Sequence, residues 1–216
     1  MITFPNAKIN LGLNILAKRS DGFHDISSVF YPVPWSDILE IIPAQTLTFQ
    51  SSGLKIPDDK LGNLCLRAYN LLQEAYNLPA VSIHLHKIVP IGAGLGGGSA
   101  DGAFTLKMLN KLFQIGLGTE QLQTYASELG SDCPFFIENK PVLAEGRGEV
   151  FSDLSTFSLS GKWLLMVYPN LHVSTQEAYA GVVPEQPAMS CQKVLEGGFG
   201  LWREYLKNDF EASLFP

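Results

Sequence analysis

The fold of this chain depends on twelve residues, Pro90-Ile91-Gly92-Ala93-Gly94-Leu95-Gly96-Gly97-Gly98-Ser99-Ala100-Asp101. Five glycines fall within seven residues of this segment, and apolar residues at helical spacing follow it. Glycine loses more conformational freedom on folding than any other residue, so this density needs a physical reason. A backbone that wraps an anion with its N–H groups, directly before the positively polarised start of a helix, supplies one. The segment therefore predicts a phosphate-binding loop.

Three familiar glycine motifs fit this loop poorly. Gly92, Gly94 and Gly97 satisfy the G-x-G-x-x-G spacing of dinucleotide-binding folds, but a second helical pattern stands where those folds have a strand. A Walker-type loop needs a lysine directly after its last glycine, and Gly98 is followed by Ser99. The companion motifs of protein kinases are also missing. Because Ser99 begins the expected helix, it could cap the helix, contact phosphate or help to hold Mg²⁺, and we favour the cap.

Composition narrows the class of protein. The 216 residues carry a net charge of −6 and are 46% hydrophobic, which is typical of a globular protein and unlike one that coats nucleic acid. Cys65, Cys133 and Cys191 are far apart and indicate reduced thiols rather than a disulfide framework. The amino terminus has no signal-peptide layout, and no apolar run reaches the roughly 18 residues of a membrane helix. We expect a cytoplasmic protein, monomeric or weakly dimeric, that binds neither nucleic acid nor membrane.

Hydrophobic periodicity predicts a mixture of strands and helices. Residues 7–16 alternate as in a half-buried strand, and residues 38–42 and 46–50 resemble the two arms of a hairpin. Further strands are expected at 26–33, 81–87 and 163–168, and helices at 63–76, 99–113 and 119–129, with a short apolar element at 135–137. Hairpins combined with paired helices favour an α+β fold over a strictly alternating α/β fold.

Four segments together resemble one family. They are Pro5-Asn6-Ala7-Lys8-Ile9-Asn10-Leu11, Arg19-Ser20-Asp21-Gly22-Phe23-His24, the glycine segment, and Gly130-Ser131-Asp132-Cys133-Pro134-Phe135-Phe136. The first and third resemble two motifs of the GHMP small-molecule kinases. The other two are similar to those members that phosphorylate the 2-hydroxyl of 4-diphosphocytidyl-2-C-methyl-D-erythritol in non-mevalonate isoprenoid biosynthesis. The resemblance extends from residue 5 to about residue 180 in the same order and spacing.

The resemblance implies an architecture and two cofactors. Residues 1–155 would form an amino-terminal domain of ribosomal S5-like β/α topology, and residues 156–216 a ferredoxin-like domain. ATP and Mg²⁺ would be the cofactors. The family's third motif, a glycine- and serine-rich loop near the carboxyl end, is absent, while Asn208-Asp209-Phe210-Glu211 resembles the segment that precedes it. We therefore expect a truncated second domain, and weaker activity of these 216 residues than of the complete gene product.

By resemblance, Lys8 and Asp132 are the catalytic residues. Asp132 would accept the proton of the attacking hydroxyl, because an alcohol is a poor nucleophile without a base. Lys8 would stabilise the charge that develops during phosphoryl transfer. From the residues alone, two other interpretations stay open. Asp132 lies two residues before Pro134, as a helix N-cap does, and Lys8 with Asn10 could belong to a solvated strand face.

By resemblance, the remaining site residues form two sets. ATP would contact Pro90, Gly92, Ala93, Gly94, Leu95, Gly96, Gly97, Gly98, Ser99, Ala100, Asn63 and Lys87. The substrate would contact Asn10, Phe23, His24, Phe30, Asp132 and Tyr179. His24 would read the edge of cytosine, and Phe23 and Tyr179 would stack on the base. Tyr179 could equally be an ordinary core aromatic residue.

Two other functions stay open at this point. Other kinases of the family act on alcohols such as homoserine or mevalonate, and a protein of this fold could bind nucleotide without catalysis. Phe23 and His24 as cytosine contacts argue against the first alternative, and the intact Lys8 and Asp132 argue against the second. His84 and His86 alternate outward on a strand, and without a third ligand nearby they indicate a solvated face rather than a metal site.

Overall fold

The computed structural model describes residues 1–56, 62–169 and 173–214. The strands are β1 (Ile2–Thr3), β2 (Asn6–Lys18), β3 (His24–Ser36), β4 (Ile38–Pro43), β5 (Thr48–Gly53), β6 (Val81–Lys87), β7 (Val142–Gly146) and β8 (Val150–Asp153). The helices are α1 (Leu64–Tyr76), α2 (Gly97–Leu112), α3 (Thr119–Leu129), α4 (Phe135–Glu138), α5 (Thr175–Ala180), α6 (Cys191–Glu196), α7 (Phe199–Tyr205) and α8 (Phe210–Leu214). The predicted α+β class is confirmed.

The chain divides into two compact units. The first comprises Met1–Lys8 and Pro32–Asn139, and the second comprises Ile9–Tyr31 and Lys140–Pro216. The long strands β2 and β3 each contribute residues to both units. The expected boundary at residue 155 falls inside the second unit, because β7 and β8 continue the sheet that β2 and β3 begin. A division into domains at that residue stays a prediction.

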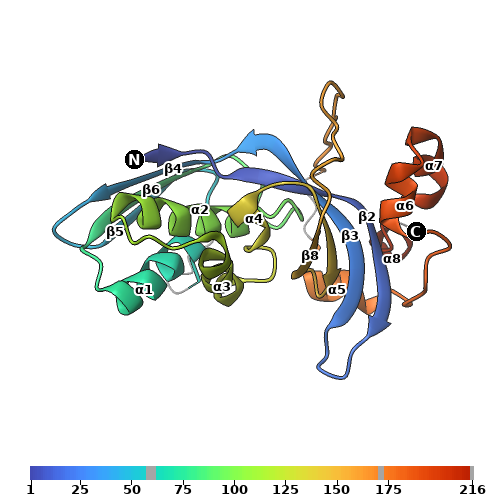
Figure 1. Ribbon diagram of the computed structural model, residues 1–216, viewed down its shortest axis with the longest axis horizontal. Coiled ribbons are helices and arrows are strands. Elements are labelled where there is room, and N and C mark those ends of the chain that lie inside the picture. Colours follow the sequence, from blue (N-terminus) through green and yellow to red (C-terminus); the bar gives the residue numbers. More distant parts are fainter. Residues whose placement is uncertain (57–61, 170–172, 215–216) are drawn as a thin grey trace. The chain divides into compact units, whose positions relative to one another are not determined.

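In the first unit, helices cover one face of a four-stranded sheet. The strand order is β1-β4-β6-β5, with β4 antiparallel to β6 and β5 parallel to β6. Helices α1, α2 and α3 lie together on one face of this sheet (Figure 1). Helix α1 makes the crossover from β5 to β6 that a parallel pair requires.

The predicted hairpin of residues 38–42 and 46–50 is wrong. Both segments form strands, but β6 lies between β4 and β5 and pairs with each of them. Burial explains this order. Strand β6 directs Val81, Ile83 and Leu85 into the core, whereas β5 is mostly exposed and suits the edge of the sheet. Alternation predicts a strand and the face it buries, but not the strand with which it pairs.

Helix α2 is the central helix of the first unit. It packs against α1, α3, α4 and β4, and ten of its residues are buried. Gly102 allows the close approach of α1, because a Cβ at this position would lie 3.0 Å from the Cβ of Leu64. In the described part of the chain, no helix combines the length and the apolar character that crossing a bilayer requires.

In the second unit, the sheet has the order β2-β3-β7-β8. The predicted strand at 7–16 is confirmed, but residues 11–15 are buried on both faces rather than on one. The second face is covered from the carboxyl-terminal part of the chain. A Cβ on Gly12 would lie 2.8 Å from Sγ of Cys191 and 3.0 Å from Cδ1 of Leu206. Alternation could not predict this burial, because the covering residues are remote in the sequence.

The predicted strand at 163–168 is wrong. These residues form neither strand nor helix. Trp163, Leu165 and Val167 are 102%, 88% and 82% exposed. A continuous apolar run becomes a strand only where a partner edge accepts its backbone hydrogen bonds. The described strands β1 to β8 pair with one another, and none of them pairs with residues 163–168.

Candidate active site

The glycine loop joins β6 to α2 through three glycines in the left-handed region. Gly92, Gly94 and Gly96 have φ angles of 74°, 72° and 67°, which residues with a Cβ rarely adopt. Gly96 is the N-cap of α2, and no side chain caps this helix. The first N–H groups of α2 therefore lack an intrahelical acceptor. Such a helix start favours an anionic ligand.

Helix α2 begins at Gly97, two residues before the expected start at Ser99. The interpretation of Ser99 as the cap is therefore wrong. The reason is that Gly96, in the left-handed conformation, already turns the chain into the helix. Ser99 instead makes a side-chain hydrogen bond with Cys133. Burial raises the pKa of the Cys133 thiol to about 11, and the bond with Ser99 opposes that rise.

One side of the loop is packed and the other is open. The N–H of Lys8 donates to the carbonyl of Leu95 over 2.9 Å. A Cβ on Gly96 would lie 2.9 Å from the ring of Phe136 and 3.1 Å from Cγ of Lys8. By contrast, a Cβ on Gly94 or Gly98 would meet nothing within 4 Å. This arrangement holds the backbone in shape and leaves one side accessible to a ligand.

Lys8 and Asp132 come together in the first unit. Nζ of Lys8 lies 3.4 Å from Oδ2 of Asp132, and the two side chains are 6% and 35% exposed. The N-cap of α4 is Pro134 and carries no side-chain hydrogen bond, so a capping role for Asp132 is not supported. Since Lys8 also packs against Gly96, the site combines an ammonium group and an accessible carboxylate beside the loop.

Asn63 and Lys87, the two expected ATP contacts outside the loop, both have structural partners. Oδ1 of Asn63 accepts the N–H of Cys65 over 2.9 Å and thereby caps α1. Lys87 is 3% exposed, and its Nζ lies 2.5 Å from Oδ2 of Asp37 and 2.7 Å from Oδ2 of Asp101. This placement supports structural roles. A contact of either residue with ATP stays a prediction.

Sequence reasoning missed Asp37 and Asp101. Both carboxylates are buried in the first unit on either side of Lys87. The sequence did contain an indication of these two residues. Asp37 and Asp101 each stand next to apolar residues that are expected to be buried, and a buried charged group needs a partner of opposite charge. Burial raises the pKa of Asp101 to about 7, although the adjacent Lys87 opposes this rise.

The expected cytosine contacts lie in the second unit. The rings of His24 and Tyr179 are stacked, with centroids 4.7 Å apart and 16° between their planes. Phe23 is 52% exposed, and Cζ of Arg147 lies 4.9 Å from the centre of its ring. The structure therefore brings Tyr179 onto His24 and Arg147 onto Phe23. Stacking of Phe23 and Tyr179 on one base stays a prediction.

The remaining substrate candidates differ in accessibility. Phe30 is 2% exposed and belongs to the core of the second unit. Asn10 is partly buried on β2, two residues after Lys8. Tyr179 also packs against a small cluster of buried residues, so the interpretation as a core aromatic is supported alongside its ring stack. The cluster consists of Leu13, Ile15 and Ile26.

His84 and His86 lie on the outer side of β6 near one hydroxyl. Oγ of Ser52 is 3.0 Å from Nε2 of His84 and 2.9 Å from Nδ1 of His86. All three side chains are at least partly exposed. Within the described ranges, no three His, Cys, Asp or Glu side chains form a group that could hold a metal ion.

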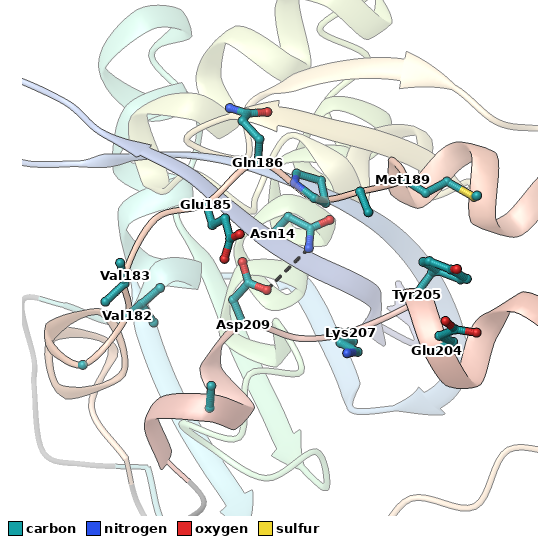
Figure 2. A pocket seen from close by; sticks show the side chains of 14 residues that line it. Asn14, Val182, Val183, Glu185, Gln186, Met189, Glu204, Tyr205, Lys207 and Asp209 are labelled. Atoms are coloured by element: carbon teal, nitrogen blue, oxygen red, sulfur yellow. Dashed lines mark hydrogen bonds between the residues drawn. The ribbon is translucent and has the colours of Figure 1, made fainter.

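A pocket of about 640 Å³ opens in the second unit (Figure 2). Across it, Nδ2 of Asn14 lies 3.5 Å from Oδ1 of Asp209. Oδ2 of Asp209 accepts the N–H of Ile15 over 2.7 Å. None of the expected site residues lines this pocket. The carboxylate of Asp209 is thus already bonded to Asn14 and Ile15, and we assign no ligand to this pocket.

Comparison with known proteins identifies the family. Residues 63–140 match the family description "GHMP kinases N terminal domain". A 4-diphosphocytidyl-2-C-methyl-D-erythritol kinase of Cytophaga hutchinsonii is 52% identical over 215 residues, which cover 100% of this chain and 80% of that protein. This chain belongs to the 4-diphosphocytidyl-2-C-methyl-D-erythritol kinase family. The kinase of this name from Bacteroides fragilis is 48% identical over 220 residues, with the same two coverages.

Solved structures agree with membership in the 4-diphosphocytidyl-2-C-methyl-D-erythritol kinase family. A crystal structure of such a kinase matches with a TM-score of 0.78 at 32% identity, over 100% of this chain and 77% of that one. The Methanococcus jannaschii mevalonate kinase matches with a TM-score of 0.54 at 14% identity, which shows a shared fold alone. The expected family, the GHMP kinase fold and the class of ATP-dependent small-molecule kinase are confirmed.

Proposed function

We propose that this chain phosphorylates the 2-hydroxyl of 4-diphosphocytidyl-2-C-methyl-D-erythritol with ATP, in non-mevalonate isoprenoid biosynthesis. The observation that carries the proposal is the pair of Lys8 and Asp132 beside the glycine loop, against which Lys8 packs at Gly96. Membership in the kinase family supports the choice of substrate, because the relatives named above carry that substrate in their names.

In the proposed reaction, Asp132 accepts the proton of the 2-hydroxyl as the hydroxyl oxygen attacks the γ-phosphorus of ATP, and the bond from that phosphorus to the bridging oxygen breaks to release ADP. The carboxylate is 35% exposed and can therefore reach a substrate. Lys8 stabilises the negative charge that develops, since its ammonium lies 3.4 Å from the same carboxylate. Positioning and charge stabilisation carry much of phosphoryl transfer, so we expect Lys8 to matter as much as the base.

The glycine loop and the amino end of α2 are the proposed site for the phosphates of ATP. The absence of a side-chain cap on α2 leaves its first N–H groups to a ligand. Gly94 and Gly98 have open space where a Cβ would stand, so a phosphate can approach the backbone closely. The partial positive charge of the helix end favours the anion.

Mg²⁺ fits this site as an ion held chiefly by phosphate oxygens and water. The described residues offer no group of three acidic or imidazole ligands, and Mg²⁺ in kinase sites commonly takes only one or two protein ligands. The hydroxyl of Ser99, on the first turn of α2, would be an oxygen ligand of the kind that Mg²⁺ prefers. When bound, the ion neutralises charge on the phosphates.

In the second unit, Phe23, His24 and Tyr179 are the proposed contacts of the cytosine base. The exposure of Phe23 and the stacked pair of His24 and Tyr179 support this role, because nucleobases bind readily to aromatic faces. Asn10 is a further proposed contact. Phe30 is buried and would act by shaping the site rather than by an open contact.

The cytoplasm is the proposed location, and a monomer or weak dimer the proposed state. Cys65, Cys133 and Cys191 are all free and buried, which agrees with a reducing compartment. The size of the assembly is tested by sedimentation at concentrations near those of the assay.

The test of this function is ADP release with Mg-ATP and three separate alcohols. We expect turnover with 4-diphosphocytidyl-2-C-methyl-D-erythritol and none with homoserine or mevalonate. Turnover of one of the other alcohols in its place would favour a different kinase of this fold. ATP binding without turnover of any alcohol would favour a nucleotide-binding protein without catalysis.

A further inference from the structure

Three buried charged side chains meet beneath the glycine loop. Asp37, which precedes β4, is fully buried, and Lys87 at the end of β6 and Asp101 on α2 are each 3% exposed. Nζ of Lys87 stands between the two carboxylates, 2.5 Å from Oδ2 of Asp37 and 2.7 Å from Oδ2 of Asp101. We call these three residues the acid–lysine cluster.

The acid–lysine cluster holds both ends of the loop. Oδ1 of Asp37 accepts the N–H groups of Ile88 and Val89, over 2.5 Å and 2.8 Å, and these two residues lead from β6 into the loop. Asp101 lies on α2, directly beyond the loop. Through the ammonium of Lys87, the entry and the exit of the loop are therefore bonded to the same pair of carboxylates.

Lys87 lies on the protein side of the loop. A Cβ on Gly97, the first residue of α2, would lie only 3.0 Å from Nζ of Lys87. The ammonium is thus packed against the first turn of the helix and is shielded from solvent. Its influence on a ligand would pass through the backbone of the loop and through its charge.

We propose that Asp37, Lys87 and Asp101 are positioning residues, which hold the glycine loop in its ATP-binding shape and adjust its affinity for ATP through their summed charge. This inference rests on the proposed role of the loop as the ATP site. It assigns to Lys87 an action through the loop in place of a direct contact with ATP.

The acid–lysine cluster contains two carboxylates and only one cation. Oδ1 of Asp101 has no hydrogen-bond partner among the described residues, so this carboxylate is under-compensated. Burial, with a smaller contribution from Asp37, raises the pKa of Asp101 to about 7, and Lys87 opposes the rise. The Cys65 thiol of α1 also faces these residues, and burial raises its pKa above its usual value, so it stays uncharged near neutral pH.

These groups predict the direction of a pH effect. The cluster is neutral when Asp101 holds its proton and carries one net negative charge when Asp101 has lost it, and this change is centred on a pKa of about 7. That charge lies beneath the amino end of α2, where it repels phosphate and cancels part of the positive potential of the helix end. ATP affinity should therefore fall as the pH rises through this range.

The first test is calorimetric titration of the protein with ATP and Mg²⁺ between about pH 6 and about pH 8, for the wild type and Asp101→Asn. Protonation of ATP and its binding of Mg²⁺ are the same with both proteins. The ratio of the two dissociation constants therefore changes with pH only through groups of the protein. We expect the wild type to lose about threefold or more in affinity relative to the variant over this interval. Parallel profiles for two proteins that both bind ATP would overturn the inference. No ATP binding by the wild type would instead overturn the proposed site.

The second test compares Lys87→Met with the double variant Lys87→Met/Asp101→Asn. The single variant leaves two buried carboxylates without a cation, and we expect ATP to bind about tenfold or more weakly. The double variant removes one of those charges and should recover most of the affinity. Equal weakness of both variants, each folded by circular dichroism, would indicate a direct contact between Lys87 and ATP and would overturn the positioning role. If the single variant does not fold, recovery of near wild-type binding by the double variant still decides the question.

Discussion

At the scale of single residues, Lys8 serves the site in two separable ways. Its backbone N–H holds the carbonyl of Leu95, and its ammonium faces Asp132. Replacing Lys8 by alanine removes the second interaction and keeps the first, because every residue except proline has a backbone N–H. The side chain can therefore be tested without detaching the loop from β2.

We predict that Lys8→Ala and Asp132→Asn each lower kcat by about a hundredfold or more, because each removes charge stabilisation or the base from the reacting centre. The measurement is steady-state ADP release at saturating ATP. Lys18→Ala is the matched control, since Lys18 is an exposed residue at the end of the same strand. A loss below tenfold in both variants would contradict their assignment as catalytic residues.

At the scale of elements, Asn63 at the start of α1 has two roles that an experiment can distinguish: the cap of the helix and the expected contact with ATP. The side chain caps the helix by accepting N–H groups of Cys65 and Leu66. We predict that Asn63→Ala lowers the free energy of unfolding by about 1 kcal/mol, while Asn63→Ser, which can also cap, restores most of it. Denaturant titration measures both. A rise of the KM for ATP in both variants alike would instead favour the expected contact with ATP.

The strand β2 supplies a second prediction at this scale. Gly12 has a φ of 73°, and a Cβ there would lie 2.8 Å from Sγ of Cys191. We predict that Gly12→Ala destabilises the protein by about 2 kcal/mol or more, from backbone strain and overpacking together. Thermal unfolding measures the loss. The control is Gly200→Ala on α7, where a Cβ would meet nothing within 4 Å and the stability should be unchanged or slightly higher.

At the scale of the whole molecule, residues 163–168 form an apolar segment whose large side chains are exposed instead of packed in a core. Trp163, Leu165 and Val167 are exposed although they belong to a continuous apolar run like that of a buried strand. Exposed apolar clusters promote association and bind hydrophobic dyes. The chain also spans 80% of the length of the kinases from Cytophaga hutchinsonii and Bacteroides fragilis.

We predict that replacing Trp163 and Leu165 together by glutamine lowers dye binding and self-association and leaves the thermal midpoint unchanged, because neither side chain is buried. Fluorescence of an anilinonaphthalene dye, sedimentation and circular dichroism measure the three quantities. A clear fall of the thermal midpoint would show that the segment has a stabilising partner.

Much of the site could be predicted because its chemistry is local. A run of glycines before a helix indicates an anion-binding backbone wherever it folds, and the motifs around Lys8 and Asp132 indicate the family. The acid–lysine cluster was not predicted, because Asp37, Lys87 and Asp101 become neighbours only when three elements pack together. The N-cap of α2 is Gly96, three residues before Ser99, because the left-handed backbone of Gly96 already turns the chain into the helix.

The amino-acid sequence was sufficient for the family, the α+β class, the strands β2 to β6 and the helices α1 to α4, and it predicts a phosphate-binding loop. These features follow from local periodicity and from residues whose chemistry does not depend on distant partners. Tertiary structure decided the insertion of β6 between β4 and β5, the burial of both faces of β2 and the pairing of Lys87 with two carboxylates. The physical reason is that pattern specifies which face of an element is apolar, whereas the partner of that face is chosen by the burial of surfaces remote in the chain. The glycine loop could therefore be predicted from the local sequence, whereas Asp37, Lys87 and Asp101, which hold it in place, became apparent only from the tertiary structure.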